Sequence, residues 1–207
     1  MCSQNLSVNI ITRKVLFCFF IIYTSDFFNC PVGFAAIPIK SIKDSVLSLA
    51  PANNNPRNSE GAFVTLKSGR ICFIYSHYTG TSSSDHASAY LASRFSDDKG
   101  KTWSQTDKLE IAQEGKMNVM SVSLLRLANG QIALFYLRKN ANDDCMPMVR
   151  FSKDEALTWS DPIACITDQQ GYFVLNNDRV IQLNNGRLVF AVALHQKKGT
   201  GVWSNTG

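Results

Sequence analysis

The sequence predicts an all-β fold of repeated four-stranded units, the blades of a β-propeller, and two repeated patterns carry this prediction. One is a hydrophobic strand, a turn with glycine and a second strand, which occurs around Gly69, Gly130 and Gly186. The other is a turn rich in serine and aspartate that ends at Trp103 and again at Trp159. Both recur at a period of about 55–60 residues, which is typical of propeller blades. Aromatic residues, 11% of the chain, also favour strands.

The glycine turns are expected to join the strands of hairpins. Residues 63–75, 122–136 and 179–191 each contain a leucine, two further residues, a glycine, a polar residue and an aliphatic residue. Ser-Gly and Asn-Gly after a strand indicate a hairpin, because glycine accepts the positive φ of such turns. Further strands are expected over residues 87–95 and 148–151. Because one blade cannot bury both of its faces alone, we expect neighbouring blades to stack on each other.

The serine- and aspartate-rich turns, residues 96–103 and 152–159, are expected to be structural. Their aspartates can accept backbone N–H bonds within the turn, and Gly100 can adopt a left-handed backbone. Ala156 stands where glycine is expected, so we expect that turn to be strained or differently shaped. The tryptophans are expected to pack between strands or blades. The residues of this prediction are Ser96, Asp98, Gly100, Thr102, Trp103, Ser152, Asp154, Thr158 and Trp159. The alternative is that these carboxylates take part in general acid–base catalysis.

The composition excludes several classes of protein. Of 207 residues, 45% are hydrophobic and 18% charged, so the chain can bury a core and is not disordered as a whole. Its net charge of +5 is spread along the sequence, with no run of more than two basic residues. Because nucleic-acid binders gather such charge into a patch, we expect no nucleic-acid partner.

Residues 1–35 are predicted to be a secretory signal peptide. Residues 15–23 form an apolar run after a basic pair, and cleavage is expected after the small residue Ala35. The run is too short to cross a bilayer, which takes about 20 residues in a helix. A buried N-terminal strand is the alternative for this segment. We therefore expect a secreted or extracytoplasmic protein whose mature part, residues 36–207, has no membrane span.

Neither a metal site nor a disulfide scaffold is expected. Outside the predicted leader the cysteines are Cys72, Cys145 and Cys165, which are odd in number and too far apart for a metal knuckle. The sequence allows one disulfide between two of these cysteines. Cys72 is expected to pack as a small hydrophobic residue. The histidines also stand apart in the sequence, so we expect no metal and no cofactor.

The turn motif resembles the Asp-box of the sialidase (neuraminidase) superfamily. Residues 96–103 match its pattern, Ser-x-Asp-x-Gly-x-Thr-Trp, at every specified position. The phrases that begin at Asn55, Met117 and Gly171 look like the BNR-repeat, sialidase-like branch, and the similarity covers roughly residues 50–195. The resemblance implies a six-bladed sialidase-type propeller and an exo-acting glycoside hydrolase that removes terminal sialic acid.

About three of these six blades are expected in this chain. We expect the first blade at about residues 50–104, the second at about 115–160 and an incomplete third at about 172–207. An open set of blades exposes strand edges and apolar faces, which favours self-association.

The phase of the repeat predicts where a pocket lies. The innermost strands of a propeller run around a central funnel, so the residues at their entrances converge. Counting back nine or six positions from each turn leucine gives Arg57, Glu60, Asn118, Ser121, Val174 and Asn177. We expect most of these polar residues, together with Arg179, to line a shared wet pocket that binds substrate. The ordinary polarity of strand ends is the alternative.

The resemblance implies roles for some of these residues. Arg57 matches the first of three arginines that hold the carboxylate of sialic acid, a task suited to the guanidinium fork. Asp85 occupies the place of the catalytic acid/base, and burial beside the sugar would raise its pKa. Glu60 is expected to orient Arg57, and His86 is an alternative proton carrier. Arg179 has no counterpart among the three arginines and is otherwise an ion-pair partner between blades.

The predicted function is that of an exo-sialidase-like glycoside hydrolase acting on sialylated glycans or related acidic sugars. The family uses a tyrosine nucleophile assisted by a glutamate. The resemblance places both in later blades, so we expect this chain to be an incomplete and weakly active or inactive form. Two alternatives stay open: a non-catalytic Asp-box propeller that binds glycans or proteins, and a glycosidase for another sugar.

Overall fold

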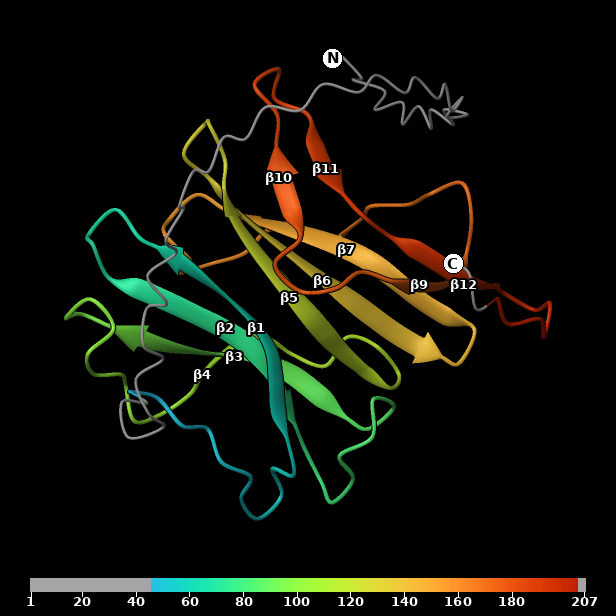
Figure 1. The fold of residues 1–207 in the computed structure, drawn as a ribbon, viewed down its shortest axis with the longest axis horizontal. Coiled ribbons are helices and arrows are strands. Elements are labelled where there is room, and N and C mark those ends of the chain that lie inside the picture. The colour runs from blue at the N-terminus through green and yellow to red at the C-terminus, as the bar shows by residue number, and fades with distance from the viewer. Residues whose placement is uncertain (1–45, 205–207) are drawn as a thin grey trace, which may run out of the picture. The chain divides into compact units, whose positions relative to one another are not determined.

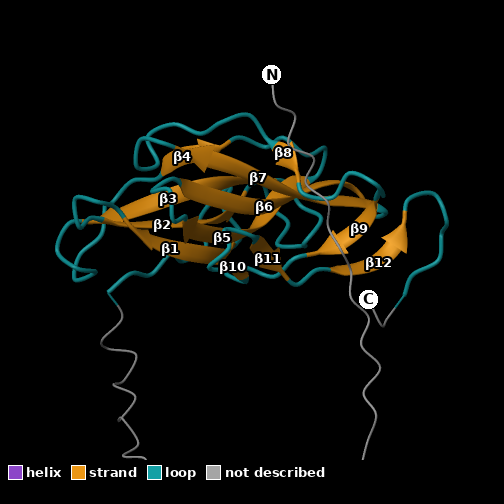
Figure 2. Cartoon of the chain, turned by 90° about the horizontal axis from the view of Figure 1, so that it is seen from above, coloured by secondary structure: helices purple, strands orange, loops and turns teal. Residues whose placement is uncertain are grey.

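The computed structural model describes residues 46–204, and over this range it contains strands and loops but no helix (Figure 2). The all-β prediction is confirmed. The strands are β1 (Asn58–Thr65), β2 (Ile71–Tyr78), β3 (Ala89–Ser96), β4 (Lys108–Ile111), β5 (Asn118–Arg126), β6 (Ile132–Ala141), β7 (Asp144–Ser152), β8 (Ile163–Ala164), β9 (Gly171–Val174), β10 (Val180–Gln182), β11 (Leu188–Phe190) and β12 (Ala193–Lys197). The predicted signal peptide, residues 1–35, lies outside the described residues.

The first two repeats each form an antiparallel up-and-down sheet. Strands β1, β2, β3 and β4 pair in that order, and β5, β6, β7 and the short β8 do the same. Figure 1 shows β5 lying between the first sheet and the rest of the second, and β5 contacts β1, β2 and β3. The sheets do not close into a ring over the described residues, and they have the form of partial propeller blades.

The third repeat contains the predicted strand–turn–strand unit, but this hairpin forms a sheet of its own and is separated from the other strands of the repeat. Strands β10 and β11 pair with each other, whereas β9 pairs with β12 and joins β7 through one parallel bridge. Residues 175–179 separate β9 from β10. The interruption arises at Asp178, whose φ is 54° and whose backbone N–H donates to Val122 of β5 at 3.1 Å. The chain therefore bends toward the second repeat at this point.

The three glycine turns have the same geometry. Gly69, Gly130 and Gly186 have φ of 87°, 86° and 85°. Each donates its backbone N–H to the carbonyl of the preceding turn leucine, at 2.9, 2.8 and 2.8 Å. The prediction that these glycines close hairpins is confirmed.

The aspartates of both Asp-box turns are occupied inside the turn. Asp98 accepts the backbone N–H of Thr102 at 2.8 Å, the Thr102 hydroxyl at 2.7 Å and the Ser96 hydroxyl at 2.9 Å. Asp154 accepts the backbone N–H of Thr158 at 2.9 Å and is also bonded by the hydroxyls of Thr158 and Ser152. These bonds lower the pKa of each aspartate to about 2, so both carboxylates are charged anchors of their turns.

The second Asp-box turn keeps the shape of the first. Lys99 and Gly100 have φ of 62° and 86°, and Glu155 and Ala156 have φ of 61° and 64°. Ala156 also keeps the backbone bond to the Ser152 hydroxyl, at 2.9 Å. The sequence predicts that this turn is either strained or differently shaped. The structure shows the first, a left-handed backbone at an alanine, and no change of shape.

The main core lies between the first two sheets. Its members come from both sheets, among them Val64, Ile74, Leu91, Val119, Val122 and Leu134. Trp159 packs against this core and donates its indole N–H to Glu110 at 2.9 Å, while Trp103 contacts the rings of Phe63 and Phe73. A second core joins the second repeat to Leu175 and Val180 of the third. The repeats therefore stack on each other, as expected of blades that cannot bury both of their faces alone.

Candidate functional site

The first strands of the three repeats are distorted at equivalent places. Glu60 in β1, Ser121 in β5 and Asp178 before β10 have φ of 55°, 60° and 54°. The β1–β2 and β5–β6 pairings shift register around Glu60 and Ser121. A left-handed backbone costs a residue other than glycine about 1–2 kcal/mol, and such strain gathers at functional sites. These positions therefore mark a candidate site.

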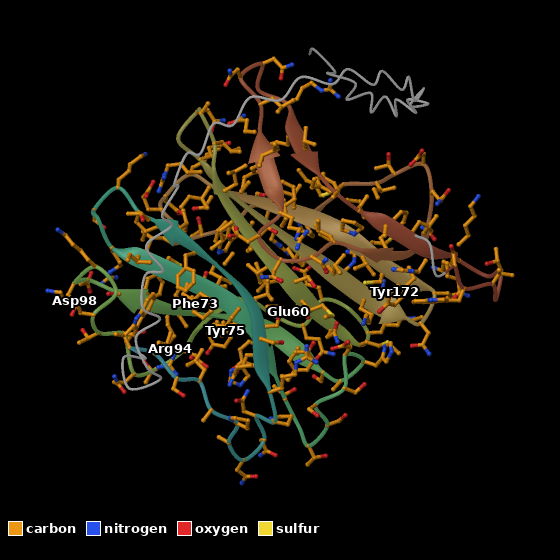
Figure 3. The ribbon with its side chains drawn as sticks, in the orientation of Figure 1. Glu60, Phe73, Tyr75, Arg94, Asp98 and Tyr172 are labelled. Carbon is orange, nitrogen blue, oxygen red and sulfur yellow. The ribbon has the colours of Figure 1, made fainter. Side chains whose placement is uncertain are left out.

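The three distorted segments meet. The side-chain amide of Asn177 donates to the carbonyl of Gly61 at 3.4 Å, and the backbone N–H of Arg179 donates to the Ser123 hydroxyl at 3.3 Å. We call this meeting point the hub; its residues are 60–61, 121–123 and 177–179. Figure 3 shows Glu60 where β1 approaches β5, whereas Asp98 lies at the far end of the first sheet. Segments of the first and second repeats thus each bond to the third repeat at the hub.

Arg57 and Asp85 lie together beside the hub. Arg57 Nη1 donates to the carboxylate of Asp85 and, at 3.2 Å, to the carbonyl of Ser83. Its Nε donates to the Ser59 hydroxyl at 3.0 Å, and the guanidinium stacks 4.5 Å from the centre of the Tyr78 ring. With side chains 26% and 59% exposed, Arg57 is held in place while Asp85 reaches solvent. The guanidinium of Arg57 is thus ordered by its partners and remains partly exposed beside Asp85.

Two carboxylates flank this guanidinium in different environments. The hydrogen bond from Arg57 holds the pKa of Asp85 below its usual range. Glu60 Oε1 lies 3.4 Å from Arg57 Nη2, while its other oxygen is buried with no hydrogen-bond partner among the described residues. Burial raises the pKa of Glu60 and outweighs the opposing effect of Arg57. The pKa values of the two carboxyls therefore shift in opposite directions.

Asn118 and Lys139 hold the backbone of Asp85 from the second repeat. The Asn118 side-chain amide donates to the carbonyls of Asp85 and Ala87, both at 2.8 Å. Lys139 Nζ donates to the same carbonyl of Asp85 at 2.9 Å. Both side chains are buried, so in this structure Asn118 contacts the loop that bears Asp85 and not the solvent.

The remaining predicted residues differ in their placement. Asn177 and Arg179 are exposed beside the hub, but Arg179 forms no ion pair with any of the described residues. An ion pair between repeats is instead made by Lys67 of the first repeat, whose ammonium lies 3.5 Å from Glu155 of the second. His86 is exposed, next to Asp85.

Three residues of the site escaped prediction from the sequence. Tyr78 of the first repeat contacts Arg57, and Lys139 of the second contacts Asp85. Tyr172 of the third repeat joins them through Lys139, whose ammonium lies 5.1 Å from the centre of its ring. Tyr78 is fully buried, which raises the pKa of its hydroxyl. Tyr78 and Lys139 stand at the ends of second strands, and comparing this position between repeats would have found them.

Neither a cavity nor a group of metal ligands points to a different location for the candidate site. A hollow of about 560 Å³ lies on the outer face of the first sheet, lined by Phe63, Phe73, Tyr75 and Trp103, and Glu60 borders it. Within residues 46–204 no group of three or more His, Cys, Asp or Glu side chains is placed to hold a metal ion. Cys72, Cys145 and Cys165 are free thiols, so the one disulfide that the sequence allows is not formed.

The architecture is that of a sialidase-type β-propeller, as the Asp-box resemblance implies. No family model and no curated protein matches the sequence. Solved structures do match the fold. The Hadza microbial sialidase Hz136 aligns with a TM-score of 0.58 and 19% identity, over 70% of this chain and 34% of its own. Trypanosoma rangeli sialidase in complex with sialic acid aligns with a TM-score of 0.53 and 18% identity, over 72% and 27%.

A protein of unknown function from Dyadobacter fermentans aligns similarly, with a TM-score of 0.57 and 19% identity, over 72% of this chain and 50% of its own. The chain thus spans between about a quarter and a half of the length of these structures. At such identities the likeness establishes a sialidase-like fold. Among the described residues, no helix is long and apolar enough to span a membrane.

Proposed function

We propose that the residues around Arg57 and Asp85 form the first part of an exo-sialidase-like site that binds a terminal acidic sugar. The observation that carries this proposal is the ordered guanidinium of Arg57, already bound to one carboxylate, beside the point where the three repeats meet. A guanidinium binds a carboxylate through two parallel hydrogen bonds, and the carboxylate distinguishes sialic acid from neutral sugars.

The proposed binding step is an exchange of carboxylates on Arg57. The sugar carboxylate replaces Asp85 on Nη1 and faces Glu60 near Nη2. Asp85 then loses the partner that lowers its pKa, and its pKa rises toward the range in which a carboxylic acid donates a proton to a leaving oxygen. In this mechanism the acidic substrate itself prepares the proton donor.

One observation favours the alternative of a non-catalytic glycan-binding module. Without ligand, Asp85 is 59% exposed and its pKa is lowered, whereas a general acid needs a raised pKa. A binding module needs only the Arg57 contact and no proton transfer. Release of a fluorescent leaving group from an aryl sialoside by the purified chain separates the two functions: turnover that is lost on Asp85→Asn supports the hydrolase, and binding without turnover supports the module.

Binding itself is tested by ligand-observed NMR with sialic acid. We expect Arg57→Ala to abolish the saturation-transfer signal of the sugar. Arg70→Ala is the matched control, because Arg70 also pairs with an aspartate, Asp97 at 2.6 Å, but does so near an Asp-box turn. Equal signals from wild type and Arg57→Ala would contradict the proposal. A signal with neutral galactose that survives Arg57→Ala would favour a glycosidase for another sugar.

Secretion remains part of the proposal and rests on residues 1–35. Expression of the full chain with its own N-terminus, followed by N-terminal sequencing of exported protein, tests it. We expect a mature N-terminus at Ala36; retention of an unprocessed chain inside the cell would contradict it.

A further inference from the structure

Lys139 is an unusual residue for the interior of this fold. Its side chain is 1% exposed, yet no carboxylate among the described residues lies within 4.0 Å of its ammonium. The ammonium donates to the carbonyl of Asp85 at 2.9 Å and lies 5.1 Å from the centre of the Tyr172 ring. Burial of an ammonium without a paired carboxylate is costly, and proteins retain such costs mainly at functional sites.

Lys139 connects all three repeats. It belongs to β6 of the second repeat and pairs in register with Asn118 of β5. Its two contacts outside this repeat are Asp85 in the loop after β2 and Tyr172 in β9.

The contact fixes one backbone atom of the Asp85 loop. Lys139 Nζ and Asn118 Nδ2 both donate to the carbonyl oxygen of Asp85, at 2.9 and 2.8 Å, so both lone pairs of this oxygen are used. Residues 80–86 of the loop are exposed. Within the first repeat, Thr79 N–H bonds Ser88 O at 2.8 Å at the ends of the loop, and Arg57 bonds the Ser83 carbonyl at 3.2 Å. The second repeat therefore locates the middle of a loop that belongs to the first.

We propose that Lys139 is a positioning residue that, together with Asn118, clamps the Asp85 carbonyl so that the Asp85 carboxyl faces Arg57. The clamp makes the geometry of the site depend on correct stacking of the first and second repeats. The inference deepens the proposed function, since the position of Asp85 matters for proton transfer. The clamp itself is measured without sugar, so its failure is distinct from failure of sugar binding.

The test uses the full chain with Lys139→Met, which keeps the length of the side chain and removes its charge and its donors. Two quantities are measured by NMR: backbone order parameters over residues 80–88, and the pKa of the Asp85 carboxyl from its ¹³C shift. The charged groups that face this carboxyl are Arg57, Lys139, His86 and Glu60. Lys108→Met is the matched control, because Lys108 also bonds a backbone carbonyl across the seam between repeats, that of Ala156 at 2.8 Å.

We expect Lys139→Met to lower the order parameters of the loop from the rigid value of about 0.85 toward about 0.6, and to raise the pKa of Asp85. The melting temperature should stay the same or rise, because a buried unpaired charge has been removed. Lys139→Arg should restore both loop quantities in part, and Lys108→Met should leave them unchanged.

A rigid loop in Lys139→Met would overturn the proposal whatever the pKa of Asp85, because loss of the nearby charge by itself raises that pKa. A loop that becomes equally mobile in Lys108→Met would overturn it too. If Lys139→Met does not fold, Asn118→Ala decides the question, since it removes the other donor to the same oxygen. A mobile loop in Asn118→Ala supports the clamp, and a rigid loop overturns it.

Discussion

The substitutions Gly100→Ala and Ala156→Gly exchange the small residues of the two Asp-box turns. Their effects on the free energy of unfolding test whether the two left-handed positions are equivalent in energy as well as in shape. Gly100 and Ala156 occupy the same left-handed position, with φ of 86° and 64°. A methyl group added at Gly100 would meet only Ile71 Cδ1, at 3.8 Å, which is ordinary contact. The cost of Gly100→Ala is therefore the left-handed strain of about 1–2 kcal/mol, reduced by about 0.4–1 kcal/mol from the stiffer unfolded chain.

In Ala156→Gly the same two contributions to the free energy of unfolding have the opposite sign, and a third contribution is lost. The substitution relieves about 1–2 kcal/mol of strain and loses about 0.4–1 kcal/mol through the more flexible unfolded chain. The methyl group of Ala156 is also part of the main core, at 1% exposure, and its removal costs about 0.8 kcal/mol. The free energy of unfolding should thus fall by about 1 kcal/mol in Gly100→Ala and stay within about 0.5 kcal/mol of wild type in Ala156→Gly.

Urea unfolding followed by tryptophan fluorescence measures both effects. With a denaturant slope of about 2 kcal/mol/M, the midpoint of Gly100→Ala should fall by about 0.5 M, and that of Ala156→Gly should hardly move. An unchanged midpoint for Gly100→Ala, or equal losses in both variants, would refute the reasoning from equivalent left-handed positions.

Three further outcomes are expected. Arg57→Gln should raise the pKa of Asp85 toward its usual range in a ¹³C NMR titration. Because a lowered carboxyl pKa stabilises the fold above the unfolded pKa and this stability is lost as the pH falls through the folded pKa, the variant should lose less stability on acidification than wild type. Leu134→Ala should lower the free energy of unfolding by about 2–5 kcal/mol in urea titration, since Leu134 is fully buried in the main core. Cys72 should react with a thiol reagent only on unfolding, because burial raises its pKa to about 12; rapid labelling of the native chain would contradict its burial.

Local signals in the sequence predict the regular parts of the fold. The glycines at 69, 130 and 186 identify the hairpins because positive φ is a property of the turn itself. The Asp-box turns follow equally from their own serine, aspartate and threonine side chains, whose bonds within the turn span five residues at most. Neither feature depends on distant parts of the chain, so both are visible in the sequence alone.

The distortions at the hub depend on contacts between repeats and are not visible locally. Glu60, Ser121 and Asp178 give no sign in the sequence of a left-handed backbone, and Asp178 bends the third repeat because it bonds to the second. The same holds for Lys139: a lysine at a strand end is ordinarily exposed, and only the stacking of three repeats buries it. The phase of the repeat does predict that Arg57 and Asn118 approach each other, and both contact Asp85.

A crystal structure of the chain with bound sialic acid tests the central claim most directly. We predict that the sugar carboxylate lies on the guanidinium of Arg57, with the Asp85 side chain released toward the anomeric hydroxyl of the sugar and its backbone still held by Lys139. A sugar bound elsewhere on the fold, or one beside Arg57 with its carboxylate turned to solvent, would contradict the account.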